Sequence, residues 1–389
     1  MLTRAIKLSK SHSLFLFGAR QTGKTTLVTQ QFSPTKTKTY NLLITSEHLR
    51  LAANPNLFRE EILALSSKIT HVFVDEVQRV PDLLNEVQVL ITGGAPQKFI
   101  LTGSSARKLK RNNANLLGGR ALTYMIFPLT IGEIGEHFDL DLTLQFGSLP
   151  HIFNAKSETE KAQLLRSYTE VYLKEEIEAE ALTRNIGGFI RFLSVAAQTN
   201  TEMCNFANIA RDVQLNPVTT KEYFKILEDT LIGQFLLPFH GSERKRHKLS
   251  PKFYFFDTGV VRAIEQRLTA PLQNKTFEYG KYFESWVINE VFRFNRYADK
   301  DWKLSFLRTA NDVEVDLIIE TPRGKTYAIE IKSKPVPTLL DFQSGFKAIL
   351  ALVPNAKCLC ICTGGESRLV GGYQVLPWRA FLDDLLPTL

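Results

Sequence analysis

A short segment near the amino end of the chain has the residue types and spacing of a phosphate-binding loop. It reads GARQTGKT, from Gly18 to Thr25, and fits the pattern G-x-x-x-x-G-K-[ST]. Gly18 and Gly23 allow the tight turn that points successive N–H groups at one phosphate, and a following helix adds the positive end of its dipole. Lys24 can reach the β- and γ-phosphates, and the Thr25 hydroxyl can bind Mg²⁺. We therefore expect ATP to contact the loop and the start of the helix, at Gly18, Ala19, Arg20, Gln21, Thr22, Gly23, Lys24, Thr25 and Thr26.

The alternative for this segment is a glycine turn that precedes Lys-Thr by chance. An apolar run, Leu14 to Phe17, comes directly before the loop, and a helical pattern follows it. Because the strand–loop–helix context is what identifies such a motif, we favour the nucleotide site.

Two acids follow a second apolar run, His71 to Val74. A carboxylate at the carboxyl end of a buried parallel strand points into the ligand crevice of an α/β sheet. Asp75 can therefore hold Mg²⁺ through water, and Glu76 can polarise the water that attacks the γ-phosphate. Two solvated acids at a strand end are the alternative, and the phosphate loop upstream favours the catalytic interpretation.

Two further positions could complete this site. Ser104 follows the strand Lys98 to Leu101, where a hydroxyl could orient the water or sense the γ-phosphate. Arg120 directly precedes the strand Ala121 to Phe127, where it could reach the phosphate of a neighbouring subunit as an arginine finger does. A surface arginine, or one paired within its own subunit, is an equally good interpretation of Arg120.

A second set of chemical residues lies in the last third of the chain. Glu284 belongs to a helical pattern, Asp316 lies in the strand pattern VEVDLIIE, and YAIEIKSK carries Glu330 and Lys332. Residues two apart on a strand share a face, so Glu330 and Lys332 point to one site, and a hairpin brings Asp316 alongside. The carboxylates Glu284, Asp316 and Glu330 suit Mg²⁺, and the lysine can stabilise charge on an attacked phosphate. Arg308 could contact a phosphate or pair with one of these carboxylates.

The composition bounds the class of protein. The chain has 389 residues, enough for two to three domains, and is 44% hydrophobic and 23% charged, as globular proteins are. Its net charge of +8 weakly favours an anionic partner such as nucleic acid. Three of the four cysteines alternate in KCLCIC, a spacing that favours buried reduced thiols over a metal site. The small number of cysteines, together with the phosphate loop, favours a cytoplasmic location. We see neither a signal peptide nor an apolar run long enough for a membrane span.

The middle of the chain reads as two helical segments with a pair of strands. We expect residues 131–200 to be helical and 201–257 to form a winged helix-turn-helix, in which Thr219 caps the second helix. Lys221 and Lys225 lie opposite its apolar face, and the basic tip GSERKRHKLSPK would touch DNA phosphates. A domain-packing module with a solvated basic loop is an equal alternative.

The whole chain resembles a group of prokaryotic AAA+ ATPases that carry a carboxyl-terminal domain of the restriction-endonuclease-like, or PD-(D/E)XK, fold. The resemblance rests on GARQTGKTTL, VFVDEVQRVP, ILTGSS, LLGGR, FPLTIGEI and the D…E-x-K set. The group usually has a proline where this chain has Ala19. The resemblance implies an α/β fold with a five-stranded parallel sheet at 1–130, a helical lid at 131–200, the winged helix at 201–257 and the nuclease-like domain at 258–389.

We therefore expect an ATP-hydrolysing AAA+ protein that binds and processes DNA, duplex or branched, with a Mg²⁺-dependent nuclease-like domain. We expect a homo-oligomer, in the form of a hexameric ring, with the ATP sites at its subunit interfaces. Two alternatives stay open. One is a DNA motor or remodeller whose nuclease fold only binds DNA, and the other is a nucleotide switch that acts on protein partners.

Overall fold

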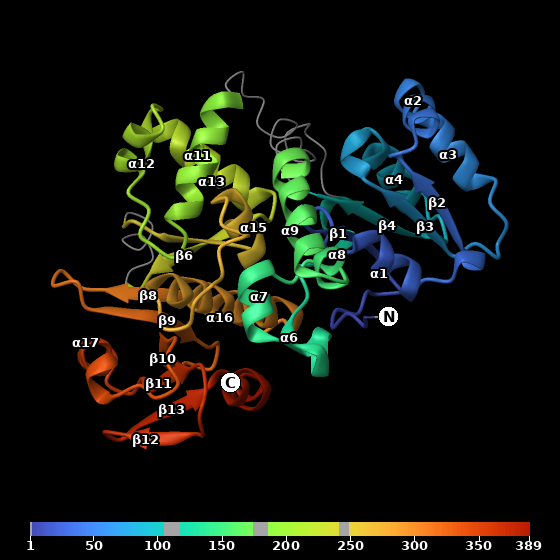
Figure 1. Cartoon of the computed structure of the whole chain (residues 1–389). Coiled ribbons are helices and arrows are strands. Elements are labelled where there is room, and N and C mark those ends of the chain that lie inside the picture. Colours follow the sequence, from blue (N-terminus) through green and yellow to red (C-terminus); the bar gives the residue numbers. More distant parts are fainter. Residues whose placement is uncertain (1, 105–116, 174–185, 241–248) are drawn as a thin grey trace. The chain divides into compact units, whose positions relative to one another are not determined.

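The computed structural model describes residues 2–104, 117–173, 186–240 and 249–389 (Figure 1). Contacts between residues divide the chain into two compact units. The described part of the first unit comprises residues 2–104, 117–129 and 226–232, and the second contains the other described residues. No described helix combines the length and apolar character that would let it span a bilayer.

The first unit is built on a parallel five-stranded sheet in the order β2-β3-β4-β1-β5. Its strands are β1 (Ser13–Phe17), β2 (Thr37–Asn41), β3 (His71–Asp75), β4 (Lys98–Gly103) and β5 (Ala121–Met125). Its helices are α1 (Lys24–Gln31), α2 (Thr45–Ala53), α3 (Asn56–Leu63) and α4 (Leu83–Thr92). The expected five-stranded parallel sheet is thus confirmed, with the Ser104 strand beside the loop strand and the Asp75 strand one place further out.

The strand that we predicted at Thr39 to Ile44 is shorter and starts earlier. β2 ends at Asn41, whose side-chain Oδ1 accepts a hydrogen bond from the Leu43 amide at 3.0 Å. Asparagine side chains stabilise turns in this way. Leu43 and Ile44 are exposed, and α2 begins at the next residue.

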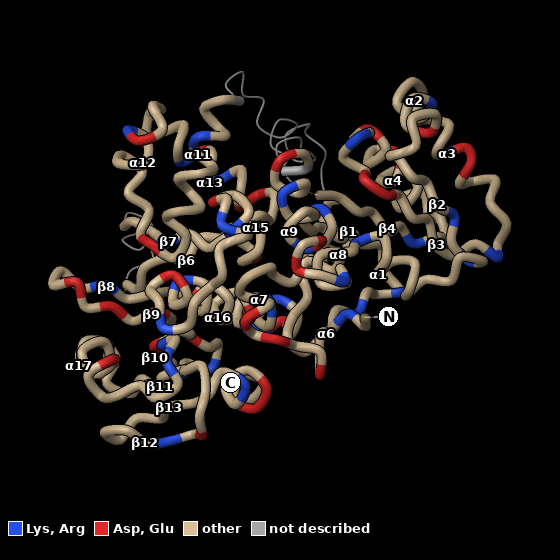
Figure 2. Tube along the Cα trace, in the orientation of Figure 1, with Lys and Arg blue, Asp and Glu red and all other residues tan. Residues whose placement is uncertain are grey.

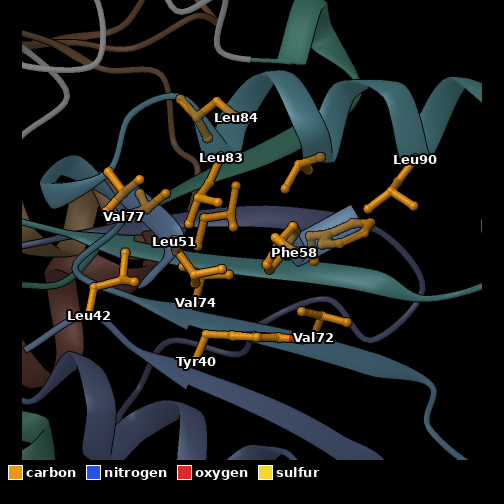
Figure 3. Packing of buried hydrophobic residues seen from close by; sticks show 14 of the residues in the cluster. Tyr40, Leu42, Leu51, Phe58, Val72, Val74, Val77, Leu83, Leu84 and Leu90 are labelled. Carbon is orange, nitrogen blue, oxygen red and sulfur yellow. The ribbon is translucent and has the colours of Figure 1, made fainter. Parts of the chain in front are cut away.

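Helices α3 and α4 cover one face of this sheet with a continuous apolar layer (Figure 3). Val72 and Val74 of β3 are fully buried against Phe58 of α3 and Leu83 of α4. Strands covered on both faces read as unbroken apolar runs, which is why the run before Asp75 was recognisable in the sequence. The packed core fixes the carboxyl ends of the strands, where the candidate nucleotide site lies.

The second unit is built on a mixed eight-stranded sheet in the order β12-β13-β11-β10-β9-β8-β6-β7. Its strands are β6 (Gly233–Pro238), β7 (Lys252–Phe255), β8 (Lys303–Arg308), β9 (Glu314–Glu320), β10 (Thr326–Lys332), β11 (Lys357–Cys362), β12 (Arg368–Val370) and β13 (Tyr373–Pro377). β6 joins the sheet by parallel pairing with β8, where Leu237 lies opposite Ser305. The two strands that we assigned to the wing therefore belong to the same sheet as the nuclease-like strands, and the predicted boundary at residue 257 crosses that sheet.

The long helix α16 (Phe277–Tyr297) lies in this unit with α15 (Thr258–Ile264) and α17 (Gln343–Leu352). Several short helices precede them in the chain: α6 (Ile131–Ile134), α7 (Leu140–Phe146), α8 (Pro150–Phe153), α9 (Glu158–Ser167) and the π-helix Tyr168–Leu173. They are tied to α15 and α16 by side chains. The Ser148 amide donates to Asp257 at 2.7 Å, and Tyr279 donates to Asp141 at 2.7 Å. Residues 130–173 thus pack within the second unit, and the lid function remains a prediction.

Helices α11 (Ile186–Gln198), α12 (Phe206–Asp212) and α13 (Pro217–Asp229) lie in the region predicted as helix-turn-helix. The turn is present, but α13 begins at Pro217. Asn216 caps this helix by accepting from the Thr219 amide at 2.8 Å, so Thr219 is not the cap. Lys221 and Lys225 are exposed, as expected. Most of the basic tip, residues 241–248, lies outside the described residues.

Candidate functional site

The phosphate loop connects β1 to α1 and is held by close contacts that exclude larger residues. A Cβ atom at Gly18 would lie 2.6 Å from the Ile126 carbonyl oxygen and 2.8 Å from the Thr22 hydroxyl. Gly23 has a φ of 93°, a left-handed conformation that glycine adopts without strain. The two glycines of the motif are therefore needed by the geometry of the loop. Gln21 is also left-handed, with a φ of 62°.

Lys24 begins α1 and is almost completely buried. Its ammonium donates to the carbonyl oxygens of Gly18 at 2.8 Å and Ala19 at 3.3 Å, and lies 3.8 Å from Glu76 Oε1. The positive charge therefore lies against the loop and faces the predicted base. Along the same segment Thr22 is buried, Arg20 is half-buried, and Thr25 and Thr26 are exposed.

The carboxyl ends of three neighbouring strands meet at Asp75. Thr25 donates to Asp75 Oδ2 at 2.8 Å, and Thr102 donates to the other oxygen, Oδ1. A hydroxyl beside a carboxylate is the ligand chemistry that Mg²⁺ prefers, so these residues fit the expected ion. Glu76 follows with a φ of 60°, an uncommon conformation for a residue with a side chain, and its amide donates to Thr102 at 3.2 Å. Strained residues of this kind cluster at functional sites.

Gln78 is a site residue that the sequence analysis missed. Its Nε2 donates to Glu76 Oε2 and, at 3.1 Å, to the hydroxyl of Ser104. One amide thus joins the predicted base to the predicted sensor, both of which lie at the carboxyl edge of the sheet. Its position only two residues after Glu76 was the feature of the sequence that could have marked it as a site residue.

Arg4 is a second missed residue, and it supports the loop from behind. Its Nη1 donates to the Thr22 carbonyl at 2.8 Å and its Nη2 to the Phe127 carbonyl at 2.6 Å. These bonds hold the loop to the segment after β5. Arg4 is 18 residues from Thr22 and 123 residues from Phe127, so no local sequence pattern marks this arginine as a support of the loop.

Arg120 lies at the amino end of the parallel strands, whereas the phosphate loop follows their carboxyl end. β5 runs parallel to β1 with Ala121 opposite Ser13 and Met125 opposite Phe17. Arg120 therefore precedes the amino end of β5, about 16 Å along the strand from the loop. Its side chain is exposed and makes no ion pair with the described residues. This position keeps it from its own phosphate loop, which leaves the finger and the surface interpretations both open.

The second unit contains a cleft of about 1180 Å³ that collects the other predicted residues. Glu284 of α16, Asp316 of β9 and Lys332 of β10 all line it, and Glu330 is buried behind Lys332. The coloured backbone trace of Figure 2 shows that acidic and basic residues both occur along β9 and β10. Antiparallel pairing of Leu317 with Ile329 brings Asp316 beside Glu330. The predicted convergence of these residues is therefore observed.

Lys332 connects the two carboxylates of this set. Its ammonium lies 2.6 Å from Glu330 Oε2 and 3.4 Å from Asp316 Oδ2, and the Ile331 amide donates to Asp316 at 2.7 Å. Burial, together with the charge of Asp316, raises the pKa of Glu330 well above its usual range. Burial alone would lower the pKa of Lys332, but the charges of Asp316 and Glu330 outweigh it and raise that pKa.

Lys252 and Glu314 also belong to this cleft, and the sequence analysis gave neither a role here. Lys252 had been placed in the basic wing tip, but its side chain is 4% exposed and pairs with Glu284 at 3.3 Å and with Glu314. Arg308 Nη1 pairs with the other oxygen of Glu314 at 3.1 Å, and Arg308 also pairs with Asp312. Its partners are therefore acids other than the predicted Glu284, Asp316 and Glu330. Glu314 precedes Asp316 by two residues, and that shared-face spacing was the available signal.

The fit of this cleft to a metal ion is partial. Asp316 and Glu330 provide carboxylate oxygens that suit Mg²⁺. Glu284 instead accepts from Lys252 and, at 2.7 Å, from Tyr254. Among the described residues, no three acidic, histidine or cysteine side chains form a group that could hold a metal ion.

Comparison with known protein families gives matches to three parts of the chain. Residues 10–135 match the family model of an AAA domain. Residues 137–271 and 279–381 match two domains of unknown function, DUF8612 and DUF4143. The first of these covers residues 137–200 of the predicted lid, the whole predicted winged helix and residues 258–271 of the predicted nuclease-like domain.

Two curated relatives are uncharacterised mycobacterial proteins. Mb2031c of Mycobacterium bovis and Rv2008c of Mycobacterium tuberculosis are each 27% identical over 336 residues, which cover 85% of this chain and 73% of theirs. Among solved structures, protein VC1899 from Vibrio cholerae aligns over 97% of this chain and 96% of its own, at 11% identity and a TM-score of 0.21. That score is too low to support a structural argument.

Proposed function

We propose that this chain, whose amino-terminal unit carries an AAA-type nucleotide-binding domain, is an ATPase that binds DNA and processes it in the cleft of its second unit. The observation that carries the proposal is the convergence of Glu284, Asp316 and Lys332 in one cleft. These residues come from a helix and two strands. A carboxylate pair with a lysine is a combination suited to phosphodiester chemistry.

In the nucleotide site the chain's own residues have separable roles. Lys24 stabilises negative charge on the β- and γ-phosphates, and Thr25 with Asp75 would hold Mg²⁺, which neutralises phosphate charge when bound. Glu76 orients the attacking water, and Gln78 fixes Glu76 relative to Ser104. Arg120 would act on the nucleotide of a neighbouring subunit, which requires a homo-oligomer such as a hexameric ring.

In the cleft, Lys332 would stabilise charge on the attacked phosphate, and Asp316 and Glu330 would hold Mg²⁺. Among the described residues that line the cleft, five carboxylates outnumber four basic side chains. The DNA backbone is negatively charged, so its entry into this lining would be opposed unless a divalent cation is bound. We therefore expect binding of DNA in the cleft to depend on Mg²⁺.

One set of incubations tests this function. Linear, single-stranded, forked and four-way DNAs are incubated with Mg²⁺, with and without ATP, using the wild type, Lys24→Ala and Asp316→Ala. We expect DNA to raise the ATPase rate, binding to weaken as salt rises, and Asp316→Ala to abolish cutting while ATP hydrolysis continues. Asp312→Ala, which removes an exposed acid of the same cleft, is the matched control. An ATPase rate that none of these DNAs changes would reject the DNA function and favour a nucleotide switch that acts on protein partners.

A second candidate, a DNA motor or remodeller that does not cut, is favoured by a specific observation. All four basic side chains among the described lining residues are already ion-paired: Lys252, Lys281, Arg308 and Lys332. Lys332 is one of them, and its pairing with Asp316 and Glu330 opposes its use to stabilise charge on an attacked phosphate. DNA that enters the cleft with a bound cation would then be held without being cut. DNA-stimulated ATP hydrolysis with no cutting of any substrate by the wild type would support this candidate.

A further inference from the structure

Lys252 lies at the start of β7, where its ammonium is enclosed by acidic side chains. The Nζ atom donates to Glu284 Oε1 at 3.3 Å and to Glu314 Oε1, and it lies 5.4 Å from the centre of the Phe306 ring. The side chain is only 4% exposed. A lysine so buried is normally held in place by the charges it neutralises.

The two carboxylates around Lys252 are also satisfied by other groups of the chain. Glu284 accepts a hydrogen bond from Tyr254 at 2.7 Å, and Glu314 Oε2 pairs with Arg308 at 3.1 Å. This half of the cleft therefore contains two carboxylates neutralised by fixed protein cations.

The other half of the cleft is arranged differently. Asp316 and Glu330 share Lys332, whose side chain is 26% exposed. Lysine side chains are flexible, and Lys332 has room to move towards solvent or substrate, whereas Lys252 is enclosed. Among the described residues, removal of Lys252 would leave Glu284 with only the hydrogen bond from Tyr254, and Glu314 with only Arg308 as a cation partner. The uncompensated negative charge of these two carboxylates close to Asp316 would then attract a divalent cation.

We propose that Lys252 is a built-in cation that takes the place of a second metal ion, so that the cleft binds one divalent cation, at Asp316 and Glu330. This inference rests on the proposed metal-dependent function of the cleft and adds the number of ions. Lys252 is thereby a positioning residue that fixes Glu284 and Glu314, and its charge repels a further cation from that half of the cleft.

The test counts bound Mn²⁺ by electron paramagnetic resonance, using the full chain without nucleotide or DNA. Every variant carries Asp75→Asn, which removes the carboxylate of the nucleotide site. We expect one Mn²⁺ per chain with Lys252 present, and two after Lys252→Met. Adding Glu314→Gln to Lys252→Met should weaken the second ion at least tenfold. Lys281→Met is the matched control and should still bind one ion, because Lys281 lines the same cleft but pairs with Glu202.

Two ions or none in the chain that retains Lys252 would overturn the proposal, as would a folded Lys252→Met variant with one. If Lys252→Met is unfolded without metal, the proposal requires excess Mg²⁺ to restore its folded circular-dichroism spectrum. Failure of Mg²⁺ to do so also rejects it. Because the measurement contains neither DNA nor ATP, its result is independent of whether the protein cuts or moves DNA.

Discussion

Thr25 donates its hydroxyl hydrogen to Asp75 at 2.8 Å, which joins the first turn of α1 to the end of β3. The two residues are 50 positions apart. In the sheet, β4 lies between β3, which ends at Asp75, and β1, which leads into the phosphate loop before Thr25. Thr102 of β4 donates to the same carboxylate, so the middle strand completes the contact. The strand order thus creates a hydroxyl–carboxylate site from three separate segments.

Glu76→Gln should stop ATP hydrolysis while ATP still binds. The carboxylate is held by Gln78 and faces Lys24, and an amide cannot polarise water as a base does. We expect the rate of phosphate release to fall about 10²–10⁴-fold, and the affinity for a fluorescent ATP analogue to change only a few-fold. Glu47→Gln, which changes an acid of α2, is the control. A rate within tenfold of the wild type would exclude Glu76 as the base.

Arg120→Ala should abolish ATP hydrolysis without weakening nucleotide binding if Arg120 serves a neighbouring subunit. Arg120 precedes the amino end of β5, whereas the phosphate loop follows the carboxyl end of β1, so the distance along the strands separates it from the loop of its own subunit. Mixing Arg120→Ala with Lys24→Ala chains should then restore part of the phosphate release, because one mixed interface has both an intact loop and an intact arginine. Full activity of Arg120→Ala alone would identify it as a surface residue.

Gly345→Ala should destabilise the second unit. A Cβ at this position of α17 would lie 2.1 Å from Glu330 Oε1 and 2.5 Å from the Glu314 carbonyl oxygen. Overpacking of this kind costs about 1–3 kcal/mol, and it would displace the buried Glu330. Urea unfolding gives the free energy, and Gly132→Ala is the matched control since a Cβ at Gly132 meets no atom within 4 Å. Equal stabilities of the two variants would contradict this close approach.

Glu290 should make the second unit less stable as pH rises. Burial raises the pKa of this carboxyl from 4.5 to about 7, although Arg293 at 3.0 Å opposes the shift. The folded chain therefore binds more protons than the unfolded chain between these values. The free energy of unfolding falls by up to about 3 kcal/mol over this interval and then levels off. This contribution is full below pH 4.5 and is lost as pH passes about 7.

Urea titrations at several pH values measure this effect. Glu290→Gln should make the decline between pH 5 and 7 shallower, because an amide does not titrate. Glu136→Gln, which changes an exposed acid of the same unit, should leave the decline unchanged. An identical slope in wild type and Glu290→Gln would show that other groups cause the pH dependence.

The sequence alone determined those parts of the candidate sites whose residues lie close together in the chain. Gly18 to Thr25 form one loop, and Asp75 with Glu76 end one strand, so local spacing was enough to predict their geometry. The alternation of Glu330 and Lys332 was equally local, because side chains two apart on a strand share a face.

Only the tertiary structure brought Lys252 to the cleft. It precedes Glu284 by 32 residues and Glu314 by 62, and it reaches them because β6 pairs with β8 and carries β7 into the sheet. Sheet order depends on long-range pairing, which local spacing does not encode. For the same reason Lys252, which we predicted in the basic tip of the wing, is instead a buried cation among carboxylates. Long-range contacts likewise place Arg4 against the phosphate loop.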